Sequence, residues 1–99
     1  MSYKIIYEPV ATKEYKEAIS WYAERSEKAA DNFIKEFKEK QSAIRNNPFR
    51  YRNTYKIFRE TSLNRFPFSI VYFVSEDNKT IIISSVYHHR RNHHKKYRK

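Results

Sequence analysis

The chain of 99 residues is long enough for one domain with a small hydrophobic core. Its 21 Lys and Arg residues exceed its 11 Asp and Glu residues, and the formal net charge of +10 favours polyanions or acidic proteins as partners. Cysteine and glycine are both absent, which excludes disulfides, thiolate metal sites and cysteine nucleophiles, together with the glycine-rich loops that hold nucleotide phosphates.

The first half of the chain predicts one short strand and two helices. Residues 3–8 are rich in β-branched and aromatic side chains, which favour a strand. Apolar residues then recur at the spacing i, i+3, i+4, i+7, and this spacing predicts an amphipathic helix over residues 12–24. Trp21 lies beside its apolar stripe, and we expect it in the core or an interface. Ser26 is a suitable N-cap for a second helix, which must end before Pro48 because proline disfavours a helical conformation of the preceding residue.

The second half of the chain predicts three strands, in residues 54–63, 65–74 and 79–89, where the side chains alternate with a period of two. The connection between the last two strands contains turn-forming residues but no glycine, so we expect a loop longer than the tightest hairpin turns. In the middle strand one apolar set should form the core face: Phe66, Phe68, Ile70, Tyr72 and Val74. The order β-α-α-β-β-β predicts a single α+β domain, residues 1–99, with an antiparallel sheet and a two-helix hairpin packed on one of its faces.

The distribution of apolar residues along the sequence suggests no membrane attachment. No apolar run approaches the roughly 20 residues that span a bilayer, and residues 1–10 lack the apolar stretch of a signal peptide. We therefore expect a cytoplasmic protein without a membrane partner. Residues 93–99 are basic and follow the last predicted strand, so we expect them to form a flexible basic tail.

The positive charge is concentrated in the second half, where residues 49–99 carry twelve Lys and Arg against three Asp and Glu. We expect the sheet face that the helices leave uncovered to be basic, because the polar positions of the strands must lie there. Arginine pairs with phosphate and tyrosine stacks on unpaired bases, so this face is a candidate surface for nucleic acid or another target. An ordinary solvated basic surface is the alternative. The predicted binding residues are Arg50, Arg52, Lys56, Arg65, Tyr87, Arg90, Lys95 and Tyr97.

Four histidines at the end of the chain, in HHRRNHH, raise the question of a metal site. Strand alternation would point His88 and His89 to opposite faces, and no carboxylate lies near them in the sequence, so we expect neither a metal site nor a cofactor. Acid–base chemistry is the better alternative, because a neutral imidazole with nearby arginines can cleave RNA through its 2′-hydroxyl without a metal ion. The candidate catalytic residues are His88, His89, Arg59 and Arg91.

Four segments carry a resemblance to a known family along nearly the whole chain. In order they are YEPVATKEYKEAISWYAERS, AIRNNPFRYR, FRETSLNRFPFSIVYFV and ISSVYHHRRN. Together they resemble the toxins of the RelE/ParE superfamily from bacterial type II toxin–antitoxin modules. The resemblance implies the same β-α-α-β-β-β topology and a small basic toxin, held inactive by an acidic antitoxin that wraps across its open surface.

The resemblance leaves the target open. RelE-like members cleave mRNA on the ribosome, whereas ParE-like members lack the cleavage residues and inhibit DNA gyrase. Ser69 stands where ribonuclease members commonly have an arginine, which weakens the ribonuclease alternative. His88 matches a histidine that some nucleases of the family use as general acid or base, His89 matches a second catalytic position, and Arg59 matches an arginine of both branches. If the protein is an enzyme, it is a metal-independent endoribonuclease; a non-toxic nucleic-acid or protein-binding module is the alternative class.

Overall fold

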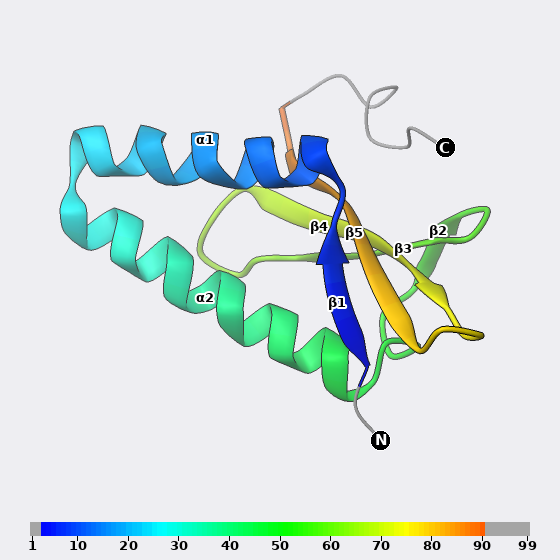
Figure 1. Cartoon of the computed structure of the whole chain (residues 1–99). Coiled ribbons are helices and arrows are strands. Elements are labelled where there is room, and N and C mark those ends of the chain that lie inside the picture. Colours follow the sequence, from blue (N-terminus) through cyan, green and yellow to red (C-terminus); the bar gives the residue numbers. More distant parts are fainter. Residues whose placement is uncertain (1–2, 91–99) are drawn as a thin grey trace.

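A helix hairpin covers one face of a five-stranded sheet in the computed structural model of the chain, which describes residues 3–90 (Figure 1). The strand order across the sheet is β1-β5-β4-β3-β2. The elements are β1 (Lys4–Tyr7), α1 (Pro9–Arg25), α2 (Glu27–Asn46), β2 (Asn53–Tyr55), β3 (Phe58–Ser62), β4 (Phe68–Ser75) and β5 (Thr80–His88). The predicted α+β domain is therefore confirmed. Arg91, Lys95, Tyr97 and the predicted tail at residues 93–99 lie outside the described residues.

The sheet is mixed and not antiparallel as predicted. β1 pairs in parallel with β5, from Lys4 opposite Thr80 to Tyr7 opposite Ile83, whereas the other three pairings are antiparallel. The alternation of side chains identifies a strand but carries no information on the direction of its partner. For this reason the sequence predicted the strands and missed the orientation of the first pair.

The predicted strand over residues 54–63 is in fact a hairpin of β2 and β3. Tyr55 pairs with Phe58, so only Lys56 and Ile57 form the turn. Lys56 has a φ of 51°, in the left-handed region that glycine usually supplies at such a turn. The side-chain amide of Asn53 donates to the carbonyl oxygens of Lys56 at 2.8 Å and Phe58 at 3.0 Å, which holds the turn in place. Because no glycine marks this turn, the sequence did not reveal it.

Local signals for the helices agree with the structure. The Ser26 hydroxyl accepts a hydrogen bond from the backbone N–H of Ala29 at 3.2 Å, as expected of an N-cap. α2 ends at Asn46, before Pro48. α1 begins at Pro9, three residues earlier than Thr12, because proline is well suited to the first helical position.

The core lies between the helices and the near face of the sheet. Phe33 and Phe37 of α2 are fully buried, and the Phe33 ring contacts Phe68 of β4, whose predicted core face is confirmed. The antiparallel register shows which residues of β5 share this face, since directly opposed side chains lie on the same side of a sheet. His88, Val86, Ile83 and Ile81 oppose Phe68, Ile70, Tyr72 and Val74.

A β-bulge in β5 interrupts its alternation. Val71 pairs with Ser85 and Tyr72 with Ile83, so Ser84 is an extra residue on β5. Before the bulge the odd-numbered Ile83 faces the helices; after it the even-numbered Val86 does. The carboxylate of Glu14, on α1 and only 4% exposed, accepts hydrogen bonds from the Val86 N–H at 2.9 Å and the Ser85 hydroxyl at 3.0 Å. Glu14 therefore joins α1 to the bulge.

Replacing Glu14 by alanine should lower the free energy of unfolding by about 2 to 4 kcal/mol, because two buried donors lose their acceptor. Urea denaturation measures this change. Ser84→Ala is the matched control, because the Ser84 hydroxyl is fully buried and has no hydrogen-bond partner among the described residues. It should leave stability unchanged within about 0.5 kcal/mol or raise it. Equal losses in both variants would contradict this role of Glu14.

Candidate functional site

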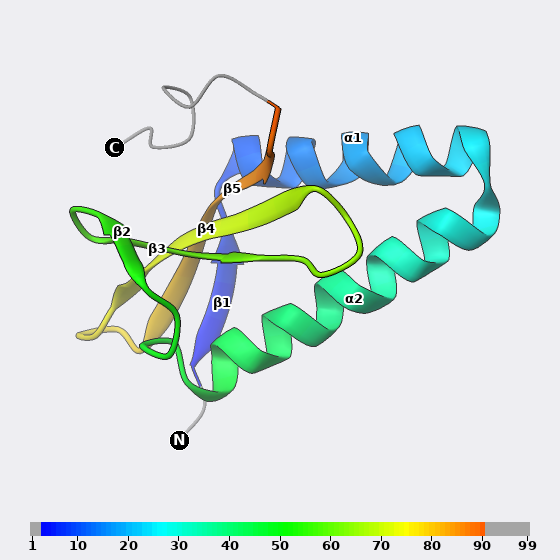
Figure 2. The ribbon, with the colours of Figure 1, turned by 180° about the vertical axis from the view of Figure 1, so that it is seen from behind.

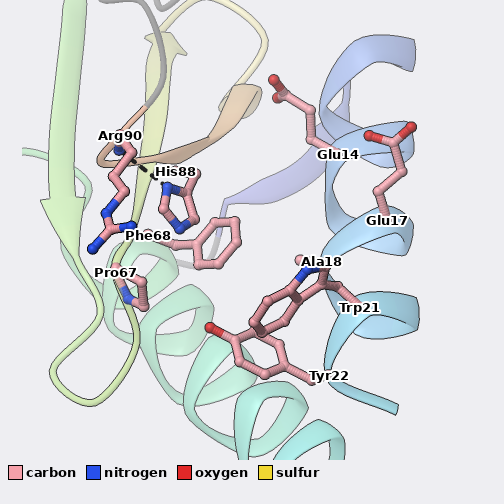
Figure 3. Close-up of a pocket in the computed structure, with 9 residues that line it drawn as sticks. All are labelled: Glu14, Glu17, Ala18, Trp21, Tyr22, Pro67, Phe68, His88 and Arg90. Carbon is pink, nitrogen blue, oxygen red and sulfur yellow. Dashed lines mark hydrogen bonds between the residues drawn. The ribbon is translucent and has the colours of Figure 1, made fainter. Parts of the chain in front are cut away.

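A groove of about 590 Å³ lies between α1 and the ends of β4 and β5 (Figure 3). One wall is the side of α1 that faces β5, and the other is formed by the start of β4 and the end of β5. The lining residues are Glu14, Glu17, Ala18, Trp21, Tyr22, Pro67, Phe68, His88 and Arg90. The groove combines aromatic walls with charged groups of both signs, which suits the binding of a peptide segment or a small molecule.

His88 is held inside this groove by two contacts. Its ring packs edge to face on Phe68, with 4.9 Å between the ring centroids. Its Nδ1 accepts a hydrogen bond from the backbone N–H of Arg90 at 3.0 Å (Figure 3). A nitrogen that accepts a hydrogen bond carries no proton, so the neutral ring holds its proton on Nε2.

Trp21 forms the exposed aromatic wall, with 52% of its surface accessible. The guanidinium of Arg25 lies 3.6 Å from the centre of the indole, and its Nη1 donates to the Trp21 carbonyl oxygen at 2.8 Å. The Tyr22 ring meets the indole edge to face at 5.0 Å. These contacts fix an exposed indole, which is typical of an anchor residue in a protein interface. Trp21 was predicted to lie in the core or in an interface, and its exposure shows that the core prediction is wrong.

His89 lies on the other side of the sheet. Its Nε2 is 3.0 Å from the hydroxyl of Ser69, which is itself 2.9 Å from the hydroxyl of Ser62. Tyr87, which opposes Ser69 in the sheet, is only 1% exposed, so its ring does not reach the surface. The predicted separation of His88 and His89 onto opposite faces is confirmed.

Arg59 faces the helices and not the open side. It opposes Tyr72, whose ring is in the core. Its Nη1 donates to the carbonyl oxygen of Tyr51 at 2.8 Å, and its guanidinium lies 5.2 Å from the centre of the Phe49 ring. The Tyr72 hydroxyl donates to the carbonyl oxygen of Pro48 at 2.6 Å. Together Arg59 and Tyr72 fasten the segment between α2 and β2 to the sheet.

The predicted basic face of the sheet is wrong. The register places Ser69, Val71, Phe73 and Ile82 on the side away from the helices, and these are neutral residues. The predicted basic binding residues that the structure describes lie in connections instead. Arg50 and Arg52 precede β2, Lys56 forms the β2–β3 turn, and Arg65 lies between β3 and β4. The backbone N–H of Arg65 donates a hydrogen bond to the Glu36 carboxylate of α2 at 3.1 Å. Arg90 lines the groove.

Three of the candidate catalytic residues, Arg59, His88 and His89, lie within the described part of the chain, and they are not gathered at one place. Arg59 opposes Tyr72 and His88 opposes Phe68, four positions apart along β4, which corresponds to about 13 Å. His89 is on the opposite face from both. Within residues 3–90, no three histidine, aspartate or glutamate side chains lie close enough to share a metal ion. The same part of the chain has no helix that is both long and apolar enough to cross a membrane.

The fold and the sequence together define a small α+β toxin. A family model described as the ParE toxin of type II toxin–antitoxin system, parDE, matches residues 5–93, so the chain belongs to this family. Among solved structures it is similar to a chain of the "Chromosomal ParDE TA system from P. aeruginosa". The TM-score is 0.72 with 18% sequence identity, and the match covers 87% of this chain and 95% of that one. At this identity the likeness concerns the fold. No curated protein sequence matches the chain.

Sequence reasoning missed the role of Glu14 and the groove beside it. Glu14, Glu17 and Lys16 look like ordinary charged residues of a solvated helix face, and only the position of β5 reveals that Glu14 is buried. The exposed Trp21 was the one available signal.

The Tyr72 hydroxyl, which bonds the Pro48 carbonyl oxygen in the segment before β2, makes the free energy of unfolding sensitive to alkaline pH. Burial raises the pKa of Tyr72 to about 12, which Arg59 partly opposes. The neutral hydroxyl therefore contributes stability that is complete below pH 10, its ordinary pKa, and is lost as the pH rises toward 12. Tyr72→Phe should lower the free energy of unfolding by about 1 kcal/mol at neutral pH and make its decline above pH 10 shallower. Urea denaturation across this range tests it; an unchanged slope would contradict the assignment.

Proposed function

We propose that this toxin acts by binding DNA gyrase and does not cleave RNA. The observation that carries the proposal is the separation of Arg59, His88 and His89. In the ribonuclease alternative, Arg59 and an imidazole must act on the same phosphate, within hydrogen-bond reach of it. Along the strand direction alone, the backbone of Arg59 is offset by about 13 Å from that of His88, and the Arg59 guanidinium is already bonded to a backbone carbonyl.

The environment of Ser69 supports the same proposal. In ribonuclease relatives the resemblance places an arginine at this position, where it would stabilise the charge of the transition state. Ser69 is 1% exposed, and its hydroxyl hydrogen-bonds with Ser62 and His89. A neutral, buried hydroxyl cannot supply that charge. The ParE-like branch, which inhibits gyrase, is the branch to which the family match belongs.

A gyrase supercoiling assay with the purified toxin, beside a translation assay that detects mRNA cleavage, tests the proposal. We expect inhibition of supercoiling and no cleavage. His88→Ala and His89→Ala should each retain growth inhibition within about threefold, whereas loss of a general acid or base lowers a rate about 10²- to 10⁴-fold. Cleavage of mRNA that either variant abolishes would contradict the proposal.

We also propose that the groove beside α1 receives a segment of an acidic antitoxin. The groove offers an apolar wall of Trp21, Tyr22 and Phe68, with the cationic Arg90 at its edge. An apolar anchor on the antitoxin would pack against the indole, and a neighbouring carboxylate would pair with Arg90. The net charge of +10 favours an acidic partner over a basic one.

Trp21→Ser should weaken antitoxin binding about 30-fold, since a buried tryptophan anchor contributes roughly 2 kcal/mol or more. Isothermal titration calorimetry with the antitoxin measures the affinity. Tyr55→Ser is the matched control, because Tyr55 is also an exposed aromatic, at 44%, but lies far along the chain in β2. It should bind as the unmodified toxin does. Equal weakening in both variants, or in neither, would remove the groove as the antitoxin site.

A further inference from the structure

We infer that the β2–β3 turn, Tyr55 to Phe58 with Arg50 and Arg52 beside it, is the element that engages the toxin's target, and that the complementary surface is an acidic protein surface with an apolar recess. This inference rests on the proposed function only in that the toxin acts by binding a protein.

The turn exposes apolar surface that the fold does not use. Ile57 is 59% exposed, more than any other large hydrophobic residue among residues 3–90, and Tyr55 is 44% exposed. The Phe58 side chain that follows is buried against Phe73, so the anchoring of the hairpin does not depend on Ile57. An exposed isoleucine at a two-residue turn lowers solubility, and polar or glycine residues are usual there. Its presence is better explained by a partner.

The turn is held rigid although its backbone is unfavourable. Lys56 occupies the left-handed region at φ 51°, which is unfavourable for a residue other than glycine. The Asn53 amide bonds the carbonyls of Lys56 and Phe58, and the Lys56 ammonium lies 5.2 Å from the centre of the Tyr55 ring. A contact element that is already ordered loses little entropy on binding.

Charge and shape define the partner. Lys56, Arg50 and Arg52 are all exposed, so this end of the molecule is cationic and attracts an acidic surface. Burying an isoleucine side chain stabilises a complex only if the partner has an apolar recess to receive it. Nucleic acid presents phosphates and flat bases, which are recognised by cations and aromatic rings, and Ile57 is neither. The combination favours a protein.

The turn and the α1 groove are at different places on the molecule. In both views the β2–β3 hairpin projects from the side opposite the connection between α1 and α2 (Figures 1 and 2). The groove is lined from α1 and from β4 and β5, and it contains no residue of β2 or β3. Substitutions at one site therefore leave the other intact.

Two substitutions test the inference, with one matched control. Ile57→Ser removes the apolar anchor without changing charge, and Lys56→Gly removes the charge while keeping a residue suited to the left-handed backbone. Lys79→Gly is the control, because Lys79 also has a left-handed φ, of 50°, in the β4–β5 turn. The readouts are growth arrest after induced expression of the full chain, thermal unfolding, and antitoxin affinity.

We expect both turn variants to need at least about tenfold more protein for growth arrest, with no loss of thermal stability and unchanged antitoxin affinity, while Lys79→Gly remains fully toxic. Full toxicity of Ile57→Ser would overturn the inference. If only Lys56→Gly lost toxicity, the contact would be electrostatic, as with nucleic acid, and the apolar recess would be wrong. Because growth arrest does not depend on which target is hit, failure to inhibit gyrase would remove the gyrase proposal and leave this test valid.

Discussion

The bulge in β5, held by the buried carboxylate of Glu14, determines what each face of this toxin presents. A regular strand shows every second side chain to the same face, so a single inserted residue exchanges the two sets beyond it. Here the insertion at Ser84 sends Val86 and His88 toward the helices and leaves Tyr87 on the opposite side. Glu14 stabilises this arrangement because it accepts hydrogen bonds from Val86 and Ser85 at the point where the ladder is disrupted. The groove exists because the end of β5 is brought to α1 in this way.

This arrangement suits binding more than catalysis. The groups that could transfer protons are held separately, His88 by Phe68 and the Arg90 backbone, His89 by Ser69. What the surface does offer is two kinds of fixed anchor: an indole stacked on Arg25, and a cationic turn with an exposed isoleucine. Preorganised anchors of this kind give affinity because few side chains must be ordered when the partner arrives.

Much of the architecture could be predicted from the sequence, and the exceptions have physical causes. The helices and the core face of β4 follow from the period of their apolar residues, and Ser26 marks the start of α2. The parallel pairing of β1 is a long-range property that no local pattern encodes. The turn at Lys56 was hidden because a lysine takes the conformation expected of glycine. Without this turn the register of β3 could not be assigned, and neither could the face on which Arg59 lies. The prediction of a basic sheet surface was wrong for this reason.

The bulge at Ser84 decides which imidazole faces the helices: it places His88 on the helix side of the sheet and His89 on the other side. Nuclear Overhauser contacts of the histidine ring protons in the labelled, folded toxin measure this directly. We predict contacts from His88 to the Phe68 ring and from His89 to the β-protons of Ser69. Neither imidazole should contact the partner of the other. The exchanged pattern, with His89 contacting the Phe68 ring and His88 contacting Ser69, is what a regular strand would give and would contradict it.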